Sequence, residues 1–92
     1  MFKAIADPTR RAILDELTDR DGQTLFELCA RLANKHGLAS TRQAISQHLD
    51  VLEEARLVST RREGRYKLHH IDTAPLREIG DRWSTPDRED ER

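Results

Sequence analysis

One stretch of the chain carries side chains that can read the edges of DNA bases. It holds two amides, an arginine, two hydroxyl groups and an imidazole, on Thr41, Arg42, Gln43, Ser46, Gln47 and His48. Glutamine can form two hydrogen bonds with adenine and arginine two with guanine, while hydroxyl groups and histidine can bond bases or phosphates. These residue types therefore predict sequence-specific contacts with double-stranded DNA, provided that one helix presents them.

A second group, further along the chain, is basic. Four cations surround Gly64, namely Arg61, Arg62, Arg65 and Lys67. Such residues neutralise phosphates and release counterions, and these contacts dominate affinity for DNA. We expect this group to lie along the phosphates or in the minor groove beside the first group. The alternative is a basic loop that only aids solubility.

The charges of the chain are segregated although their sum is close to zero. Sixteen Lys and Arg residues stand against 17 Asp and Glu residues, a formal net charge of −1. Residues 56–67 nevertheless carry a net charge of +4, while residues 13–28 carry −4 and residues 84–92 carry −2. The composition therefore excludes a polybasic tail but is compatible with a locally basic face.

Capping residues and apolar spacing predict the helices that would position the first group. A side chain that accepts hydrogen bonds from the first turn marks each start, and apolar residues at helical spacing mark each buried face. The predicted helices are 8–18 after Asp7, a second from Thr24 to near Ala33, and a third from Ser40 or Thr41 to about Ala55. The connection over 34–39 is longer than the turn of most helix-turn-helix units.

From residue 57 onward, the spacing of the apolar residues changes from that of a helix to that of a strand. Residues 57–71 predict a β-hairpin with its turn at Glu63 and Gly64, where glycine supplies a positive φ. One face of the second strand is expected to pack and the other to be basic. The packing face would hold Tyr66, Leu68 and His70, and the basic face Arg65, Lys67 and His69.

Two helices, a turn, a third helix and a basic hairpin are what a winged helix-turn-helix protein requires. The major groove of B-DNA admits one helix, whose N-terminal residues reach base edges, and the hairpin contacts the backbone beside it. The sequence therefore predicts a mainly α-helical fold with a small β-hairpin (α+β) and a function in DNA binding. The domain would span residues 1–83, including a last helix capped by Asp72 or Thr73, with a polar, disordered tail over 84–92.

Four stretches resemble the ArsR/SmtB-type family of bacterial winged-helix repressors. They are 2–14 (FKAIADPTRRAIL), 42–55 (RQAISQHLDVLEEA, with the characteristic Ser-x-His-Leu), 62–68 (REGRYKL) and 72–79 (DTAPLREI). In this order they are similar to the family's opening, recognition helix, wing and last helix. The resemblance implies a transcriptional repressor that acts by occupying its promoter.

The resemblance also implies a homodimer whose first and last helices pack across a twofold axis, so that each recognition helix reads half of an inverted-repeat operator. The sequence favours a dimer independently, because a domain of this size offers little core to apolar residues at its two ends. The residues expected in the interface are Phe2, Ile5, Leu76, Ile79 and Trp83. The alternative is that they all pack within one chain.

Two positions depart from the family pattern. Arg56 stands where the family has a glycine after the recognition helix, so we expect a left-handed residue strained by about 1 kcal/mol. Arg31 stands where the arsenic- and cadmium-sensing members carry a second cysteine. Soft metals need two or three thiolates in one site, so we expect Cys29 to lie in the core, with a role as metal ligand or redox sensor as the alternative.

No metal or other cofactor is expected. Residues 72–83 contain no histidine, which removes the pattern of the family's zinc site. His69 and His70 are neighbours on a strand and point to opposite faces, so they cannot bind one ion together. His48 is expected to contact a phosphate or to pack between helices.

Other classes of protein fit the sequence less well. It has no glycine-rich phosphate loop and no metal cluster, so we expect no enzyme. No apolar stretch approaches a membrane span, the N-terminus lacks a signal peptide, and a single cysteine fits a reducing compartment, so we expect a cytoplasmic, nucleoid-associated protein. The remaining alternative is a winged-helix module that binds a protein instead of DNA, although such a helix would more often expose aromatic or aliphatic residues.

Overall fold

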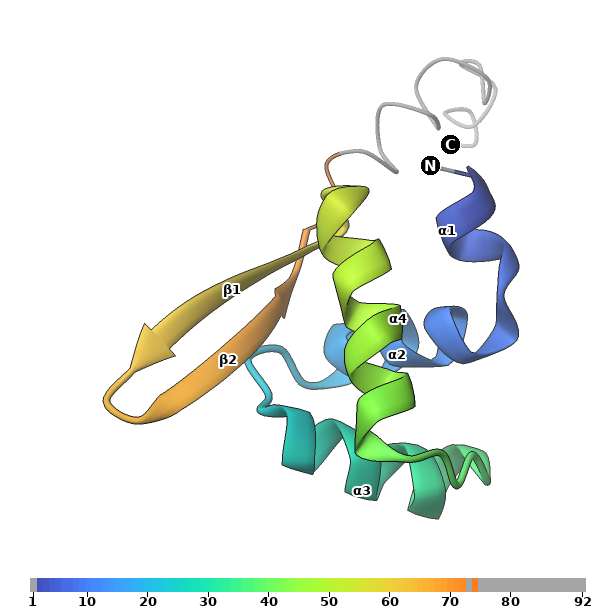
Figure 1. Cartoon of the computed structure of the whole chain (residues 1–92), viewed down its shortest axis with the longest axis horizontal. Helices are drawn as coiled ribbons and strands as arrows, with labels where there is room; N and C mark the ends of the chain where they lie inside the picture. The colour runs from blue at the N-terminus through green and yellow to red at the C-terminus, as the bar shows by residue number, and fades with distance from the viewer. Residues whose placement is uncertain (1, 73, 75–92) are drawn as a thin grey trace, which may run out of the picture.

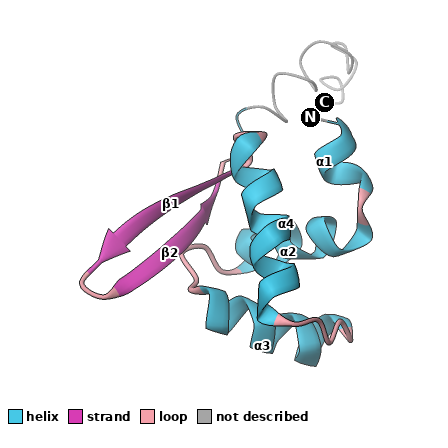
Figure 2. Cartoon of the chain, in the orientation of Figure 1, coloured by secondary structure: helices cyan, strands magenta, loops and turns pink. Residues whose placement is uncertain are grey.

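Four helices and a two-stranded antiparallel hairpin follow one another in the computed structural model, which describes residues 2–72 and 74 (Figure 1). The helices are α1 (Phe2–Ala6), α2 (Pro8–Asp19), α3 (Leu25–His36) and α4 (Arg42–Glu54), and the strands are β1 (Val58–Glu63) and β2 (Tyr66–Ile71). The helices gather on one side and the hairpin projects away from them (Figure 2). The predicted fold class, mainly helical with a small hairpin, is confirmed.

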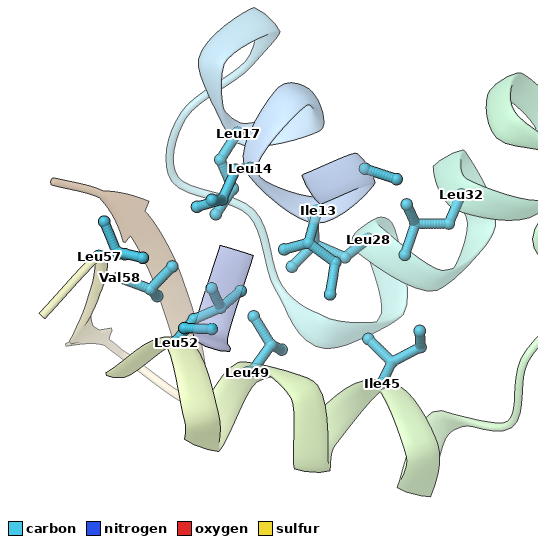
Figure 3. Close-up of a cluster of buried hydrophobic side chains, with 12 residues drawn as sticks. Ile13, Leu14, Leu17, Leu28, Leu32, Ile45, Leu49, Leu52, Leu57 and Val58 are labelled. Atoms are coloured by element: carbon cyan, nitrogen blue, oxygen red, sulfur yellow. The ribbon is translucent and has the colours of Figure 1, made fainter. Parts of the chain in front are cut away.

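The apolar stripes of α2, α3 and α4 meet in one core (Figure 3). Its most deeply buried members are Ile13, Leu17, Leu28, Leu32, Ile45, Leu52 and Leu57. Burying one such side chain contributes about 1.5–3 kcal/mol, so these stripes supply most of the stabilisation and fix α4 against the other helices. Val58, the first residue of β1, belongs to the same core and attaches the hairpin to it.

The start of each long helix is held by a capping side chain that the sequence predicts. Asp7 accepts hydrogen bonds from two main-chain N–H groups of α2, at 2.7 and 3.2 Å. Thr24 and Glu27 form both halves of a capping box at the start of α3. Thr41, and not Ser40, caps α4 through a hydrogen bond of 3.0 Å. A cap contributes typically about 1 kcal/mol, so these local contacts define where the helices begin.

The end of α3 differs from the prediction. The helix continues to His36 instead of ending near Ala33, and Gly37 closes it with a φ of 67°. The predicted connection over 34–39 therefore begins too early. The additional residues are polar and extend no apolar stripe, but two of them contact Glu16 of α2: Lys35 forms an ion pair with it, and Nε2 of His36 lies 3.5 Å from its carboxylate.

A buried carboxylate joins α2 to α3. Glu16 is 1% exposed. One of its oxygens lies 2.8 Å from Lys35 Nζ and 3.5 Å from His36 Nε2, and the other lies 3.4 Å from Arg31 Nη1. Burial by itself raises the pKa of a carboxyl, but the hydrogen bond and charge of Lys35 help to outweigh it, so the pKa of Glu16 lies below its ordinary value of 4.5. Glu16 lies three residues after Ile13 and therefore on the apolar face of α2. This helical spacing is the signal in the sequence for its burial.

The hairpin has a two-residue turn. Its strands are paired along their whole length, ending with Glu63 opposite Tyr66. The turn therefore consists of Gly64 and Arg65, and not of Glu63 and Gly64 as predicted. Gly64 has the predicted positive φ, at 63°.

The face of β2 that packs against the helices is the one predicted to be basic. His69 is 4% exposed, whereas Tyr66, which was predicted to pack, is 59% exposed. The physical reason is a contact with a distant segment, since the main chain of Gln23 pairs with His69. The imidazole Nδ1 also lies 3.0 Å from the carbonyl oxygen of Gln23. Lys67 shares this face but lies nearer the tip and is exposed.

The predicted dimer residues lie at the two ends of the chain. Ile5 of α1 is half-buried and packs against the core. The side chain of Phe2, the predicted last helix with Leu76, Ile79 and Trp83, and the predicted tail over 84–92 lie outside the described residues. Asp72, one of the two predicted caps of that helix, accepts a hydrogen bond of 3.0 Å from the N–H of Ala74.

Arg56 follows α4 with the left-handed backbone that was predicted. Its φ is 64°, and no other non-glycine residue in the described part of the chain has a positive φ. Its N–H donates to the carbonyl oxygen of Glu53 at 2.9 Å, and that of Leu57 donates to Leu52 at the same distance. These bonds close the last turn of the helix. They require a left-handed backbone at Arg56, which is strained for a residue that has a Cβ.

Replacing Arg56 by glycine removes this strain and is expected to raise the free energy of unfolding by up to about 1 kcal/mol. Urea denaturation measures the difference. Arg56→Ala is the matched control, because it removes the same charge and keeps the Cβ, so it should bring no such gain. Equal stability of the glycine and alanine variants would contradict the strain.

Replacing Glu16 by glutamine is expected to lower the free energy of unfolding at neutral pH by about 1–3 kcal/mol, because the charge-assisted bonds are lost. Since the pKa of Glu16 is lowered by folding, the carboxylate stabilises the fold above its ordinary pKa, and this advantage disappears as the pH falls below 4.5. The two proteins should therefore converge in stability in urea denaturation at acidic pH. Asp15→Asn, on the exposed side of α2, should change little. A deficit that persists unchanged at acidic pH would exclude the charge as its cause.

Candidate nucleic-acid interface

The outward face of α4 presents the residues predicted to contact bases. The opposite face is held in the core by Ile45, Leu49 and Leu52. The exposed members of the predicted group are Thr41, Arg42, Gln43 and Gln47, and the half-buried members are Ser46 and His48. The first half of α4 thus offers mainly neutral hydrogen-bonding groups to solvent, at the end of the helix that can enter a major groove.

His48 differs from the others because it contacts α2. Its Nδ1 lies 3.4 Å from Nη1 of Arg10. The same guanidinium donates hydrogen bonds to the carbonyl oxygens of Ala4, at 2.8 Å, and of Lys3, at 3.2 Å. His48 therefore makes a packing contact between helices, one of its two predicted roles, and Arg10 links α1 to α4.

The basic residues of the hairpin lie on its exposed part. All four of them are exposed, and none forms an ion pair with another described residue. Arg62 and Lys67 stand directly opposite each other across the strands. Like charges in this position destabilise a hairpin, and a polyanion along the face would remove the repulsion. This arrangement favours phosphate binding over the alternative of a loop that only aids solubility.

The loop between α2 and α3 anchors the hairpin beside α4. Gln23 and His69 exchange two main-chain hydrogen bonds, of 2.7 and 3.1 Å. One carboxylate oxygen of Asp21 accepts a hydrogen bond of 2.7 Å from the N–H of Ile71, and the other lies 2.9 Å from Nδ1 of His70. The loop runs alongside β2 in Figure 1. β2 is therefore held by β1 on one edge and by this loop on the other.

Sequence reasoning missed this anchor, because residues 18–22 show only the composition of a loop. Gly22 is the available signal. It has a φ of 75°, and a Cβ there would lie 3.0 Å from Cε1 of His70, so the close approach of loop and strand requires glycine. Burial raises the pKa of Asp21, but the hydrogen bonds from Ile71 and His70 outweigh it, so that pKa lies below its ordinary value of 3.8.

Cys29 and Arg31 occupy the positions that metal-sensing members of the resembling family use. Cys29 is half-buried and packs against the core, and this burial raises the pKa of its thiol. Arg31 forms an ion pair with Glu16. Within residues 2–72 and 74, no group of three or more His, Cys, Asp or Glu side chains could hold a metal ion.

Comparison with known proteins gives the family. A model of helix-turn-helix domains matches residues 5–61. The HTH-type transcriptional regulator YuzN of Bacillus subtilis is 48% identical over 83 residues, which cover 90% of this chain and 90% of that protein. The solved structure of an ArsR-like transcriptional regulator from Rhodococcus sp. RHA1 matches with a TM-score of 0.79 and 30% identity, over 98% of this chain and 76% of that one. This chain belongs to the ArsR/SmtB family of winged helix-turn-helix regulators.

Membership of the ArsR/SmtB family makes this chain a DNA-binding regulator of transcription, as the sequence predicted. A further member, the transcriptional repressor SdpR of Bacillus subtilis, is 36% identical over 78 residues, which cover 85% of this chain and 79% of that protein. In this family, α3 and α4 form the helix-turn-helix and the hairpin forms the wing. These relatives are regulators and not enzymes.

None of the helices described here is long and apolar enough to span a membrane.

Replacing Asp21 by alanine removes both side-chain contacts that hold the end of β2. We expect the amide hydrogen of Ile71 to exchange about tenfold faster, while amides in the middle of α2 keep their protection, because the wing opens locally. Hydrogen exchange followed by NMR measures both. Asp50→Ala, on the exposed side of α4, is the control. Unchanged exchange at Ile71 would contradict the anchoring role of Asp21.

Proposed function

We propose that this chain is a homodimeric repressor that reads an inverted-repeat operator in double-stranded DNA. The observation that carries the proposal is the juxtaposition of a neutral hydrogen-bonding face on α4 with a wing whose cations have no acidic partner among the described residues. A groove bordered by the start of α3, by α4 and by the wing is lined by residues of both groups, Ser46 from α4 with Arg65 and Lys67 from the hairpin. The similarity to SdpR, which is named a repressor, supports repression as the outcome of binding.

The predicted site residues divide into three roles. Side chains at the start of α4 would bond base edges in the major groove, with the hydroxyl groups bonding bases or phosphates. These residues are Thr41, Arg42, Gln43, Ser46 and Gln47. The cations of the wing would bind phosphates or the adjacent minor groove, through Arg61, Arg62, Arg65 and Lys67. His48 would orient α4 through its contact with Arg10.

Apolar residues at both ends of the chain would form the dimer. They are Phe2, Ile5, Leu76, Ile79 and Trp83. A twofold axis between two copies would bring two α4 helices to major grooves about 34 Å apart, which requires an inverted-repeat operator. Residues 1–83 would then be the domain for binding and dimerisation, and residues 84–92 a polar tail. The proposed place of action is the nucleoid in the cytoplasm, with no metal or other cofactor.

The proposal predicts different losses for two kinds of residue. Arg62→Ala should weaken binding to all sequences alike and flatten the slope of log K against log salt by about one unit, because one phosphate contact is lost. Gln47→Ala should leave the slope unchanged and relax base preference by about 1–3 kcal/mol at one position of each half-site. Fluorescence anisotropy over a salt series, with an operator selected from random-sequence DNA and an unrelated duplex, measures both effects.

Arg20→Ala is the matched control, because it removes an exposed cation that is not one of the four wing cations and lies at the end of α2, beside the loop that holds the other end of β2. It should change neither the slope nor the base preference. An unchanged slope for Arg62→Ala would remove the wing from the interface. If the wild-type protein selects no DNA sequence and its binding does not depend on salt, the alternative of a protein-binding module is favoured instead.

A further inference from the structure

An open groove separates the start of α3 from the wing. It has a volume of about 330 Å³ and is lined by Thr24, Phe26, Ser46, Arg65, Tyr66 and Lys67, among others. A second hollow, of about 640 Å³, shares Thr24, Phe26 and Tyr66 with the first and is also lined by Gly22, Glu27 and Leu68. In Figure 1 the start of α3 and the hairpin lie on the same side of α4.

Two aromatic side chains stand open in this groove. Phe26 is 69% exposed and Tyr66 is 59% exposed, and they are the large hydrophobic residues that the described chain leaves exposed. A single exposed apolar residue is ordinary. Two of them, from segments far apart in the sequence and lining one groove, form a patch that a bound partner would cover.

The surroundings of the groove indicate which partner this is. Arg65 and Lys67 flank it on the wing, within a segment of net charge +4, and Ser46 of α4 flanks it on the other side. In the proposed complex, a DNA strand with bases read by α4 and phosphates held by the wing would pass over the space between them. The two cations of this groove therefore match the phosphates of a DNA backbone, whereas the acidic residue nearby, Glu27, lines only the second hollow.

We propose that Phe26 and Tyr66 are further DNA-contacting residues, which pack against deoxyribose rings of the strand that crosses the groove. Arg65 and Lys67 hold the phosphates on either side of these rings. The proposal rests on the proposed function and adds a non-ionic subsite to it. A deoxyribose ring presents C–H groups, so contact with an aromatic side chain removes apolar surface from water. The sugar carries no base information, so the subsite strengthens binding to every sequence.

Such a subsite has a signature that distinguishes it from the cations of the wing. Affinity that comes from neutralising phosphates falls with rising salt, because bound counterions are released. Contact between an aromatic ring and a sugar releases no counterions, so affinity from this source does not depend on salt. Loss of an aromatic residue should therefore weaken binding by the same factor at every salt concentration.

The test compares Phe26→Ala and Tyr66→Thr with the wild-type full chain, where threonine preserves the preference of β2 for strand. Fluorescence anisotropy over a salt series gives Kd for the selected operator and for an unrelated duplex. We expect Kd to rise about three- to tenfold for both DNAs, with an unchanged salt slope. Phe26→Tyr keeps a ring at this position and should retain the affinity. Asn34→Ala, an exposed position of α3 that does not line the groove, should also have no effect.

Unchanged affinity of both aromatic variants would overturn the proposal. A loss accompanied by a flatter salt slope would overturn it too, because the variant would then have displaced the cations. Circular dichroism verifies the fold, and if Tyr66→Thr is unfolded, Phe26→Ala alone decides, since its exposed ring contributes little to the core. Failure of the proposed function is a different result, namely that the wild-type chain itself binds no DNA.

Discussion

The arrangement of α2, α3 and the wing depends on the buried residue Gln23, which is 1% exposed. Its side-chain amide donates a hydrogen bond of 2.7 Å to the carbonyl oxygen of Arg20, and its main chain pairs with His69 of β2. Each buried polar group that lost its partner would cost about 1–3 kcal/mol. Gln23 therefore donates a hydrogen bond to the residue that ends α2, directly precedes Thr24, which caps α3, and holds the wing in place.

Because α2 is also joined to the other helices, it is the common support of α4 and the wing, the two elements proposed to contact DNA. Arg10 connects it to His48 on α4, and Glu16 connects it to α3. The position at which the metal-sensing type carries a second cysteine is part of this support, since Arg31 binds Glu16. The position that holds a metal-coordinating cysteine in those members holds an arginine here, and this arginine attaches α3 to α2.

The sequence predicts the features that depend on neighbouring residues and misses those that depend on distant ones. Thr41 caps α4 through the N–H of its own first turn, so the start of that helix and the face it exposes could be predicted. The packing face of β2 could not, because Leu68 fits the alternation better than His69. His69 is buried because Gln23, 46 positions away, pairs with it. The last turn of α3 likewise contacts Glu16 of α2 through Lys35 and His36, and residue spacing within α3 does not reveal these contacts.

The two cations that face each other across the wing are expected to respond to ionic strength in opposite ways in the free protein and in the proposed complex with DNA. In the free protein, dissolved ions screen the repulsion between Arg62 and Lys67 and so steady the tip of the hairpin. In the proposed complex with DNA, the same ions would compete with these side chains for phosphates and weaken binding. The repulsion is thus greatest at low ionic strength, where binding to DNA is also expected to be tightest. If these cations bind phosphates, part of the affinity for DNA would come from relief of the repulsion between Arg62 and Lys67.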